Sequence, residues 1–195
     1  SFPLIKELTE TFDEIVVSTG ATYDDEVMYA AEILKGTNFS MLHCVTLYPT
    51  PLDQVHLARM EWLRSLAPSV GYSDHSLVSE NGLLASKAAL ALGADILERH
   101  FTLLPEGETK DGPVSINKEQ LQELSNFSKL SLGDRLSKMD LDYPDWKIMI
   151  GNKKRVLTDE ELLNRDYYRG RFSSKRKGYK DGDRMIFNWE ETPLV

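Results

Sequence analysis

Strand-like and helix-like segments alternate four times in the first part of the chain. Short apolar runs rich in Val, Ile and Leu end in turn-forming residues, and a run of helical length follows each of them. Because these runs are apolar throughout rather than alternating, they predict strands that are buried on both faces of a parallel sheet covered by helices. The four predicted strands are Glu14–Ser18, Phe39–Thr46, Ser69–Ser73 and Asp95–Arg99.

Helix-end signals support the segments between and around these strands. Thr22 is a predicted N-cap followed by acidic residues that suit a first helical turn, and Asn117 is a second predicted cap. The predicted helices are Pro3–Thr11, Asp25–Lys35, Leu57–Leu66, Leu83–Leu92 and Lys118–Leu130. Four βα units are about half of a (β/α)₈ barrel, which typically needs about 250 residues. We therefore predict an α/β TIM-barrel type of fold in which only about four units are present.

Two of the predicted strands lead directly into a histidine. The stretch Val70–Ser76 reads VGYSDHS and Ile96–Thr102 reads ILERHFT, with an Ala- and Leu-rich run of helical length between them. A strand–helix–strand crossover places its strands parallel and adjacent, so His75 and His100 are predicted at one carboxyl edge of the sheet. That edge carries the functional groups of α/β proteins. Imidazole suits divalent transition metals, so the pair predicts a metal site; the alternative is two histidines that only form hydrogen bonds at strand ends.

The composition limits the classes of partner. A net charge of −8 argues against nucleic acid or an anionic membrane as the main partner. No apolar stretch approaches the ~20 residues needed to cross a bilayer, and no signal peptide is visible. The single cysteine, Cys44, fits a reducing compartment. We therefore predict a cytoplasmic protein that binds neither membranes nor nucleic acid.

Four motifs in sequence order resemble the sialic acid synthase family. They are STG at 18–20, HCVTLYPTP at 43–51, GYSDHS at 71–76 and LERHFT at 97–102, each at the carboxyl end of a predicted strand. The family includes N-acetylneuraminate, legionaminate and pseudaminate synthases. Its members are (β/α)₈ barrels that condense phosphoenolpyruvate with an N-acetylated hexosamine to a nine-carbon 2-keto sugar acid, using a divalent metal such as manganese. The resemblance implies that this chain carries barrel strands five to eight.

The resemblance assigns roles to four residues at the strand ends. His75 and His100 match the family's metal ligands, with Mn²⁺ the expected ion, and His100 is also placed among the catalytic residues. Ser18 and Ser73 match serines that hold phosphoenolpyruvate, which suits hydroxyl groups near backbone N–H donors. From the residues alone, each serine could simply end its strand.

Two further residues match the family's sugar site. The proline-flanked turn around Tyr48 would hold its ring stiffly, although Tyr48 could equally pack beneath the loop. Asp111 matches an acid that binds sugar hydroxyls, and this assignment depends on the resemblance because an isolated loop aspartate usually has no such role. Asp74 alternates to the other side of its strand, which predicts a structural role or the orientation of a ligand. His43 and Cys44 are predicted to be core residues.

The resemblance divides the chain into three regions: 1–132 as the C-terminal half of a synthase-type barrel, 133–165 as a linker, and 166–195 as the truncated start of an antifreeze-like domain. Within the linker, Asp140–Trp146 is predicted to be irregular, and a short helix is predicted to start at Thr158. The Lys- and Arg-rich run Arg165–Lys180 has two readings. It is either a solvated linker or a contact for an anionic ligand or a neighbouring subunit.

The family's catalytic glutamates and phosphate-binding lysines lie mostly on the first four barrel strands, which this sequence lacks. We therefore expect a segment of a synthase that needs an N-terminal half, and the start at Ser1 in a helix also favours a segment. Exposed sheet edges predict pairing with that half or a homodimer. One alternative is a non-catalytic half-barrel used for assembly or sugar binding. Another is a different phosphoenolpyruvate-dependent synthase that makes other 2-keto sugar acids.

Overall fold

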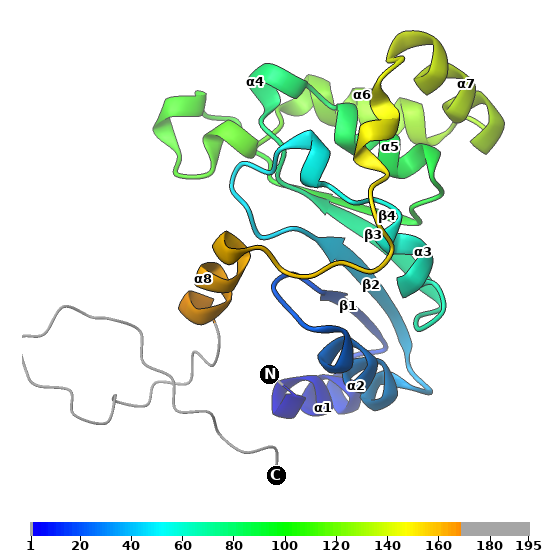
Figure 1. Ribbon diagram of the computed structural model, residues 1–195, viewed down its shortest axis with the longest axis vertical. Coiled ribbons are helices and arrows are strands. Elements are labelled where there is room, and N and C mark those ends of the chain that lie inside the picture. Colours follow the sequence, from blue (N-terminus) through cyan, green and yellow to red (C-terminus); the bar gives the residue numbers. More distant parts are fainter. Residues whose placement is uncertain (1, 169–195) are drawn as a thin grey trace, which may run out of the picture.

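The computed structural model describes residues 2–168, and a parallel four-stranded sheet lies at its centre (Figure 1). The strands follow one another in the order β1-β2-β3-β4, and each neighbouring pair is parallel. They are β1 (Glu14–Ser18), β2 (Asn38–Cys44), β3 (Ser69–Asp74) and β4 (Ile96–Arg99). The predicted alternation of strands and helices is therefore confirmed, with strand ends that differ from the prediction by one or two residues, a normal margin for element boundaries.

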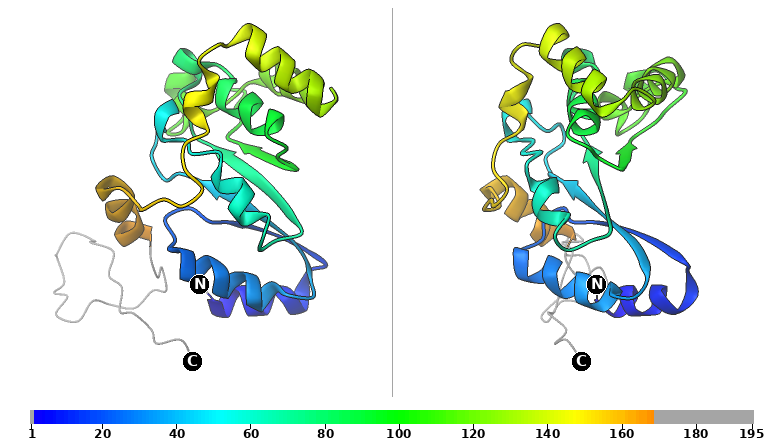
Figure 2. Two further views of the ribbon diagram at one scale, coloured as in Figure 1. Left: turned by 45° about the vertical axis from the view of Figure 1, so that its right-hand side comes forward. Right: turned by 90° about the vertical axis from the view of Figure 1, so that its right-hand side faces the viewer.

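Helices connect the strands and continue beyond the last of them. The α-helices are α1 (Phe2–Thr11), α2 (Asp24–Leu34), α3 (Arg59–Leu63), α4 (Val78–Asn81), α5 (Leu84–Ala91), α6 (Lys118–Ser128), α7 (Leu132–Asp142) and α8 (Asp159–Tyr168). Four short 3₁₀ helices, η1 (Leu52–Gln54), η2 (Glu106–Glu108), η3 (Gly112–Val114) and η4 (Trp146–Met149), lie in the connections. Figure 2 shows the blue helices α1 and α2 at one end of the sheet and the green to yellow helices at the other. The arrangement is that of a half-barrel.

The core lies between one face of the sheet and the helices. Ile15 lies beside Phe39 and Met41 lies beside Val70 in the strand registers, and all four side chains are buried in the core. Strand side chains alternate between faces, and Val16, on the opposite face, is 48% exposed. We call this opposite side the open face of the sheet.

Only the two central strands are buried almost throughout. β2 and β3 are buried after their first residue, whereas β1 and β4 keep exposed side chains on the open face. The prediction that every strand is buried on both faces is therefore wrong for β1 and β4. The reason is positional: within the described part of the chain, β1 and β4 lie at the two edges of the sheet, so each is shielded from solvent by a neighbouring strand on one side only.

Two predicted helix starts differ from the observed ones. Thr22 does not cap α2: its hydroxyl donates to the Thr19 carbonyl at 2.7 Å, and Tyr23 is the N-cap. The helix predicted over Leu57–Leu66 is only Arg59–Leu63: Leu57 and Ala58 before it and Ser65 and Leu66 after it lie in turns, and the Leu57 and Ala58 N–H groups donate at 2.8 Å to carbonyls of the segment after α7. In contrast, the predicted cap of α6 is confirmed, with the Asn117 side chain accepting from the Gln120 N–H at 2.9 Å.

The region after α6 is more regular than predicted. α7 continues to Asp142, so the prediction of irregular chain from Asp140 is wrong for its first residues, and α7 packs against α5. The predicted helix start at Thr158 is confirmed, because the Thr158 hydroxyl accepts from the Glu161 N–H at 3.3 Å. The division at residue 133 stays a prediction. The antifreeze-like start and most of the basic run lie outside the described residues.

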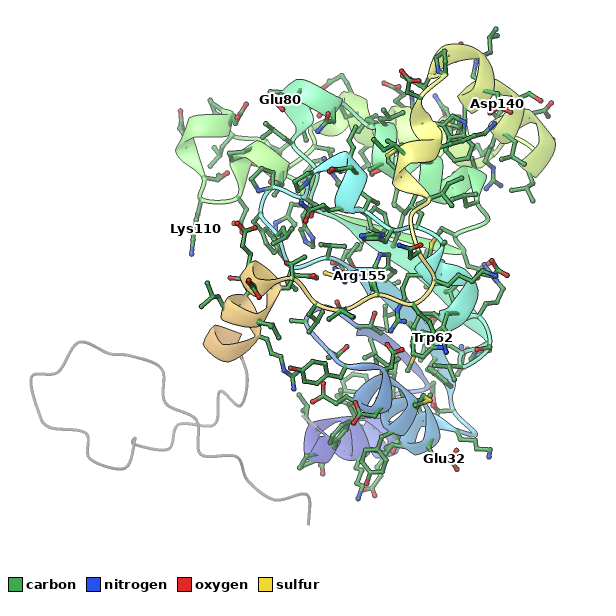
Figure 3. All side chains as sticks on the ribbon, viewed as in Figure 1. Glu32, Trp62, Glu80, Lys110, Asp140 and Arg155 are labelled. Carbon is green, nitrogen blue, oxygen red and sulfur yellow. The ribbon has the colours of Figure 1, made fainter. Side chains whose placement is uncertain are left out.

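The chain between α7 and α8 returns across the molecule to the sheet. The Lys153 carbonyl accepts from Arg59 Nη1 at 3.1 Å, and Arg155 forms an ion pair with Glu161, which is 0% exposed. Figure 3 shows Arg155 in the middle of the molecule, beside the chain that leads to α8. Among residues 2–168, no helix is both long and apolar enough to span a membrane.

His43 is a core histidine, as predicted, and it gives a test of the fold. It is 2% exposed and its Nε2 lies 2.7 Å from the Val55 carbonyl oxygen. Burial lowers the pKa of His43 to about 3, partly opposed by this hydrogen bond. The unfolded chain, with a histidine pKa of about 6.5, therefore binds more protons than the folded chain between these two pH values.

We expect His43 to decrease the stability of the fold as the pH falls from about 6.5 towards 3. One extra proton on the unfolded state corresponds to at most ~1.4 kcal/mol per pH unit. Urea unfolding of the wild type and His43→Gln at pH 7, 6 and 5 measures this effect as a difference in slope, since the other groups titrate in both proteins. Equal slopes in the two proteins would contradict the assignment.

Candidate functional site

Three aromatic rings meet at the carboxyl edge of the sheet. Tyr48 follows β2, His75 follows β3 and His100 follows β4. The ring centroids of the two histidines are 5.2 Å apart with the rings edge to face, and the Tyr48 ring lies 4.1 Å from that of His75. Tyr48 is 6.2 Å from His100. The structure thus brings both predicted metal ligands together with one predicted sugar-binding residue.

The two histidines have different surroundings. His75 is 3% exposed, and burial together with the nearby His100 lowers the pKa of His75 to about 4. The side chain of His100 is 31% exposed, and its Nδ1 lies 3.6 Å from Asp111 Oδ2. A neutral imidazole has a free lone pair for a metal, so His75 is in the metal-binding form at neutral pH.

Cys44 packs against the buried histidine. Its Sγ lies 3.9 Å from His75 Nδ1, and the residue is 5% exposed. Burial raises the pKa of the Cys44 thiol to about 11. A thiol that stays protonated is a poor nucleophile and a poor metal ligand, which agrees with the prediction that Cys44 acts as a small apolar residue.

The two serines lie on the open face with β2 between their strands. Ser18, at the end of β1, is exposed and its Oγ accepts from the Gly20 N–H at 3.4 Å. Ser73 on β3 is 1% exposed, and its hydroxyl has no hydrogen-bond partner among the described residues. A buried polar group without a partner costs about 1–3 kcal/mol. The unpaired Ser73 hydroxyl therefore suggests a ligand that would satisfy it.

Glu98 is a candidate site residue that was not among the residues predicted from the sequence. It lies beside Ser73 in the β3–β4 register and is exposed. The alternation of strand side chains places Glu98 on the same face as His100, two residues later. That alternation within LERHFT is the signal that could have identified it. Glu98 adds a carboxylate to the open face, next to the histidines.

Asp74 has the structural surroundings that its position predicts. It is 0% exposed and forms an ion pair with Arg99 on the helix side of the sheet. The Ser86 hydroxyl also donates to Asp74 Oδ2, at 2.5 Å. These contacts occupy the carboxylate, so it does not reach the open face.

A cavity of about 460 Å³ lies beside Tyr48, between the loop after β2 and α8. Its lining residues are Leu47, Tyr48, Pro49, Glu160, Leu163 and Asn164. The Asn164 side chain donates to the Thr46 carbonyl at 2.5 Å, and Arg165 forms an ion pair with Glu26 at 2.6 Å. Helix α8 is therefore attached to the loop after β2 and to α2, and it forms one wall of this cavity.

The described residues offer a metal two ligands rather than a complete cage. Nowhere in residues 2–168 do three or more His, Cys, Asp or Glu side chains form a group that could hold a metal ion. The two edge-to-face histidines fit a site with two protein ligands and open positions for water and substrate. Asp111 lies near His100, where it could orient the ring.

Comparison with protein families and relatives gives a consistent result. Residues 1–131 match the model of the NeuB family. An uncharacterized protein, MJ1065, of Methanocaldococcus jannaschii is 35% identical over 133 residues, which cover 66% of this chain and 38% of that protein. The N,N'-diacetyllegionaminic acid synthase of Campylobacter jejuni is also 35% identical, over 64% of this chain and 38% of the relative. The chain thus spans about two fifths of the length of these relatives.

Solved structures share the fold. The spore coat polysaccharide biosynthesis protein SpsE of Bacillus subtilis superposes with a TM-score of 0.67 at 24% identity, over 85% of this chain and 46% of its own. The N-acetylneuraminic acid synthetase of Leptospira borgpetersenii gives a TM-score of 0.58 at 24% identity, over 87% of this chain and 55% of its own. The four-stranded sheet therefore corresponds to part of a larger chain in each of these structures.

Proposed function

The chain belongs to the NeuB family, and on this premise we propose that it is the part of a sialic-acid-type synthase that carries barrel strands five to eight. The proposed reaction joins phosphoenolpyruvate, an N-acetylated hexosamine and water into a nine-carbon 2-keto sugar acid, with release of inorganic phosphate. The names of its relatives support this, since they include legionaminic and pseudaminic acid synthases. The observation that carries the proposal is the convergence of Tyr48, His75 and His100 at one edge of the sheet.

His75 and His100 would hold a divalent metal, with Mn²⁺ the proposed ion. When bound, the metal would act as a Lewis acid that polarises the aldehyde of the sugar. The contribution of the chain is to keep His75 neutral by burial and to hold the two rings edge to face. His100, beside Asp111, is the ring closer to solvent and would lie at the reacting end of the sugar.

The remaining predicted residues would bind the two substrates. The Ser73 hydroxyl is free to donate to an oxygen of phosphoenolpyruvate, and Ser18 lies on the same face two strands away. The Asp111 carboxylate can accept hydrogen bonds from sugar hydroxyls, and the half-exposed Tyr48 ring can pack on the sugar. Ordered in this way, the C3 carbon of phosphoenolpyruvate would attack the sugar aldehyde from a fixed direction.

The cavity beside Tyr48 supports an N-acetylated acceptor. Its lining combines Leu47 and Leu163 with the Glu160 carboxylate. An acylamino group has an N–H that can donate a hydrogen bond to a carboxylate and a methyl group that leucine side chains can cover. None of the six lining residues is cationic, so this cavity suits an acylamino group better than a phosphate.

The proposed site needs further strands to be complete. Among the strands of residues 2–168, β1 and β4 each pair on one side only, and Val16 on the open face is 48% exposed. Exposed edges and apolar faces favour association. We propose that the other barrel strands pair along β1 and β4, supplied by the same gene product or by a second chain, and that the assembly is a homodimer or such a pair.

Product analysis tests the proposed function. The chain, assembled with the remaining barrel strands, is incubated with Mn²⁺, phosphoenolpyruvate and N-acetylated hexosamines, and the products are analysed by mass spectrometry. We expect a nine-carbon 2-keto sugar acid and release of phosphate. An assembled barrel that releases no phosphate with any hexosamine would favour the non-catalytic half-barrel, and a product of another chain length would favour a different 2-keto acid synthase.

Replacing Ser73 by alanine is expected to raise the KM for phosphoenolpyruvate about 10-fold or more. A hydrogen bond to a charged group contributes about 1.5–3 kcal/mol, and the buried Ser73 hydroxyl has no other described partner. Ser69→Ala is the matched control, because Ser69 lies on the same strand and face but at the amino end of β3. Steady-state kinetics of both variants would contradict the assignment if the two KM values were equal.

A further inference from the structure

The residues directly before the two histidines are paired with each other. Asp74 and Arg99 lie opposite one another in the β3–β4 register, at the last position of each strand. Their side chains are 0% and 3% exposed and form an ion pair. Because strand side chains alternate, this pair lies on the helix side of the sheet, and His75 and His100 point to the open face.

The ion pair is part of a larger buried network. Asp74 Oδ1 accepts from the Ser76 N–H at 2.8 Å, and Asp74 Oδ2 accepts from the Ser86 hydroxyl of α5. Arg99 donates to the Ser76 carbonyl at 2.7 Å and to the Ser76 hydroxyl at 3.1 Å. The backbone on both sides of His75 is therefore attached to the residue that precedes His100.

Stability alone does not account for such a pair. Buried ion pairs can often be replaced by apolar residues without loss of stability, because burial of the charges offsets much of their attraction. An ion pair with several hydrogen bonds fixes the geometry of the groups that it joins. The planar guanidinium of Arg99 fixes it toward both Asp74 and Ser76. Here that geometry is fixed one residue away from each proposed metal ligand.

We propose that Asp74 and Arg99 are positioning residues, which set the separation and orientation of His75 and His100 for a divalent metal. The inference rests on the proposed metal-binding role of the histidines and deepens it. Partners that orient metal ligands typically change metal affinity 10- to 100-fold. The pair would touch neither metal nor substrate and would act only through the backbone of the two strands.

The test is Mn²⁺ titration of the full 195-residue chain and of the double variant Asp74→Asn/Arg99→Gln. The double change leaves no unpaired charge in the core, and far-UV circular dichroism checks that the variant is folded. We expect its Mn²⁺ affinity, from isothermal titration calorimetry, to fall about 10- to 100-fold. An unchanged affinity in the folded variant would overturn the proposal.

The Arg64–Asp95 pair is a matched control. This pair lies at the amino ends of β3 and β4, opposite to the end that carries the histidines. Arg64 Nη1 is 3.1 Å from Asp95 Oδ2, which also accepts from the Val70 N–H. Arg64→Gln/Asp95→Asn should keep wild-type Mn²⁺ affinity. If it weakens binding as much as the Asp74/Arg99 variant does, general loosening of the strands explains the effect and the proposal is wrong.

Two additional variants keep the test decisive. If the double variant does not fold, Arg99→Lys retains the charge without the planar fork, and we expect a smaller loss of Mn²⁺ affinity; wild-type affinity in this variant would contradict the proposal. His75→Ala/His100→Ala tests the premise separately. If the double histidine variant still binds Mn²⁺ like the wild type, the proposed metal site itself is wrong. If it loses binding while the Asp74/Arg99 variant keeps wild-type affinity, only the positioning role is rejected.

Discussion

Replacing both His75 and His100 by alanine is expected to abolish specific Mn²⁺ binding, with a loss of affinity of more than about 100-fold. Loss of a residue that merely orients a ligand already costs 10- to 100-fold, and here both ligands are removed. Nowhere in residues 2–168 do three or more His, Cys, Asp or Glu side chains form a group that could bind the metal in their place. Isothermal titration calorimetry of the folded variant measures the effect.

A different histidine provides the control for this experiment. His56 has a positive φ of 52° and its Nδ1 accepts from the Asn152 N–H at 3.2 Å, so it serves the connection to α8. His56→Asn tolerates the same backbone conformation and should keep wild-type Mn²⁺ affinity. Retained binding in His75→Ala/His100→Ala would show that the metal site lies elsewhere. If binding is lost, the two single variants show how much each ring contributes.

The second large effect is expected at Gly71, in the middle of β3. A Cβ atom at this position would lie 2.3 Å from the Ile96 carbonyl oxygen and 2.5 Å from Leu42 Cδ2. The backbone oxygen belongs to β4, so it can move only if β3 and β4 separate. We expect Gly71→Ala to destabilise the fold by about 3 kcal/mol or more, at the upper end for overpacked sites.

Urea unfolding of Gly71→Ala measures this loss, with Gly107→Ala as control because a Cβ at Gly107 meets nothing within 4 Å. Gly107→Ala should remain close to the wild type in stability. Since β3 and β4 carry the two histidines, a folded fraction of Gly71→Ala is also expected to bind Mn²⁺ more weakly. Wild-type stability of Gly71→Ala would contradict the observed contact between the strands.

The sheet could be predicted from the sequence because its signals are local. Each strand is a short apolar run that ends near a turn, so Glu14–Ser18 was predicted with both ends correct. The parallel order follows from the helical runs between the strands. The exposed faces of β1 and β4 could not be predicted, because apolar residues such as Val16 have the same character whether or not another strand covers them.

The errors arise where distant parts of the chain meet. The helix predicted from Leu57 begins later, at Arg59, and the turn before it is bound to a distant segment, since the Leu57 N–H donates to the Met149 carbonyl. The continuation of α7 through Asp142 depends on packing against α5. No local pattern reports either contact, so propensity alone gave the wrong boundary in both places.

The candidate site was predictable where its residues follow strand ends. Tyr48, His75 and His100 come from three separate motifs, and the sheet brings their rings together. The Asp74–Arg99 pair could not be inferred in detail, since its geometry depends on the register of β3 and β4. Glu98 was within reach of the strand alternation and was missed.

Pulsed electron paramagnetic resonance of Mn²⁺ bound to the chain is the sharpest test of the two-histidine metal site, because it detects nitrogen nuclei coordinated to the ion. We expect coupling to two histidine nitrogens, of which one is lost in His75→Ala and one in His100→Ala. Bound Mn²⁺ without nitrogen coupling, or with a coupling that persists when both histidines are replaced, would contradict it.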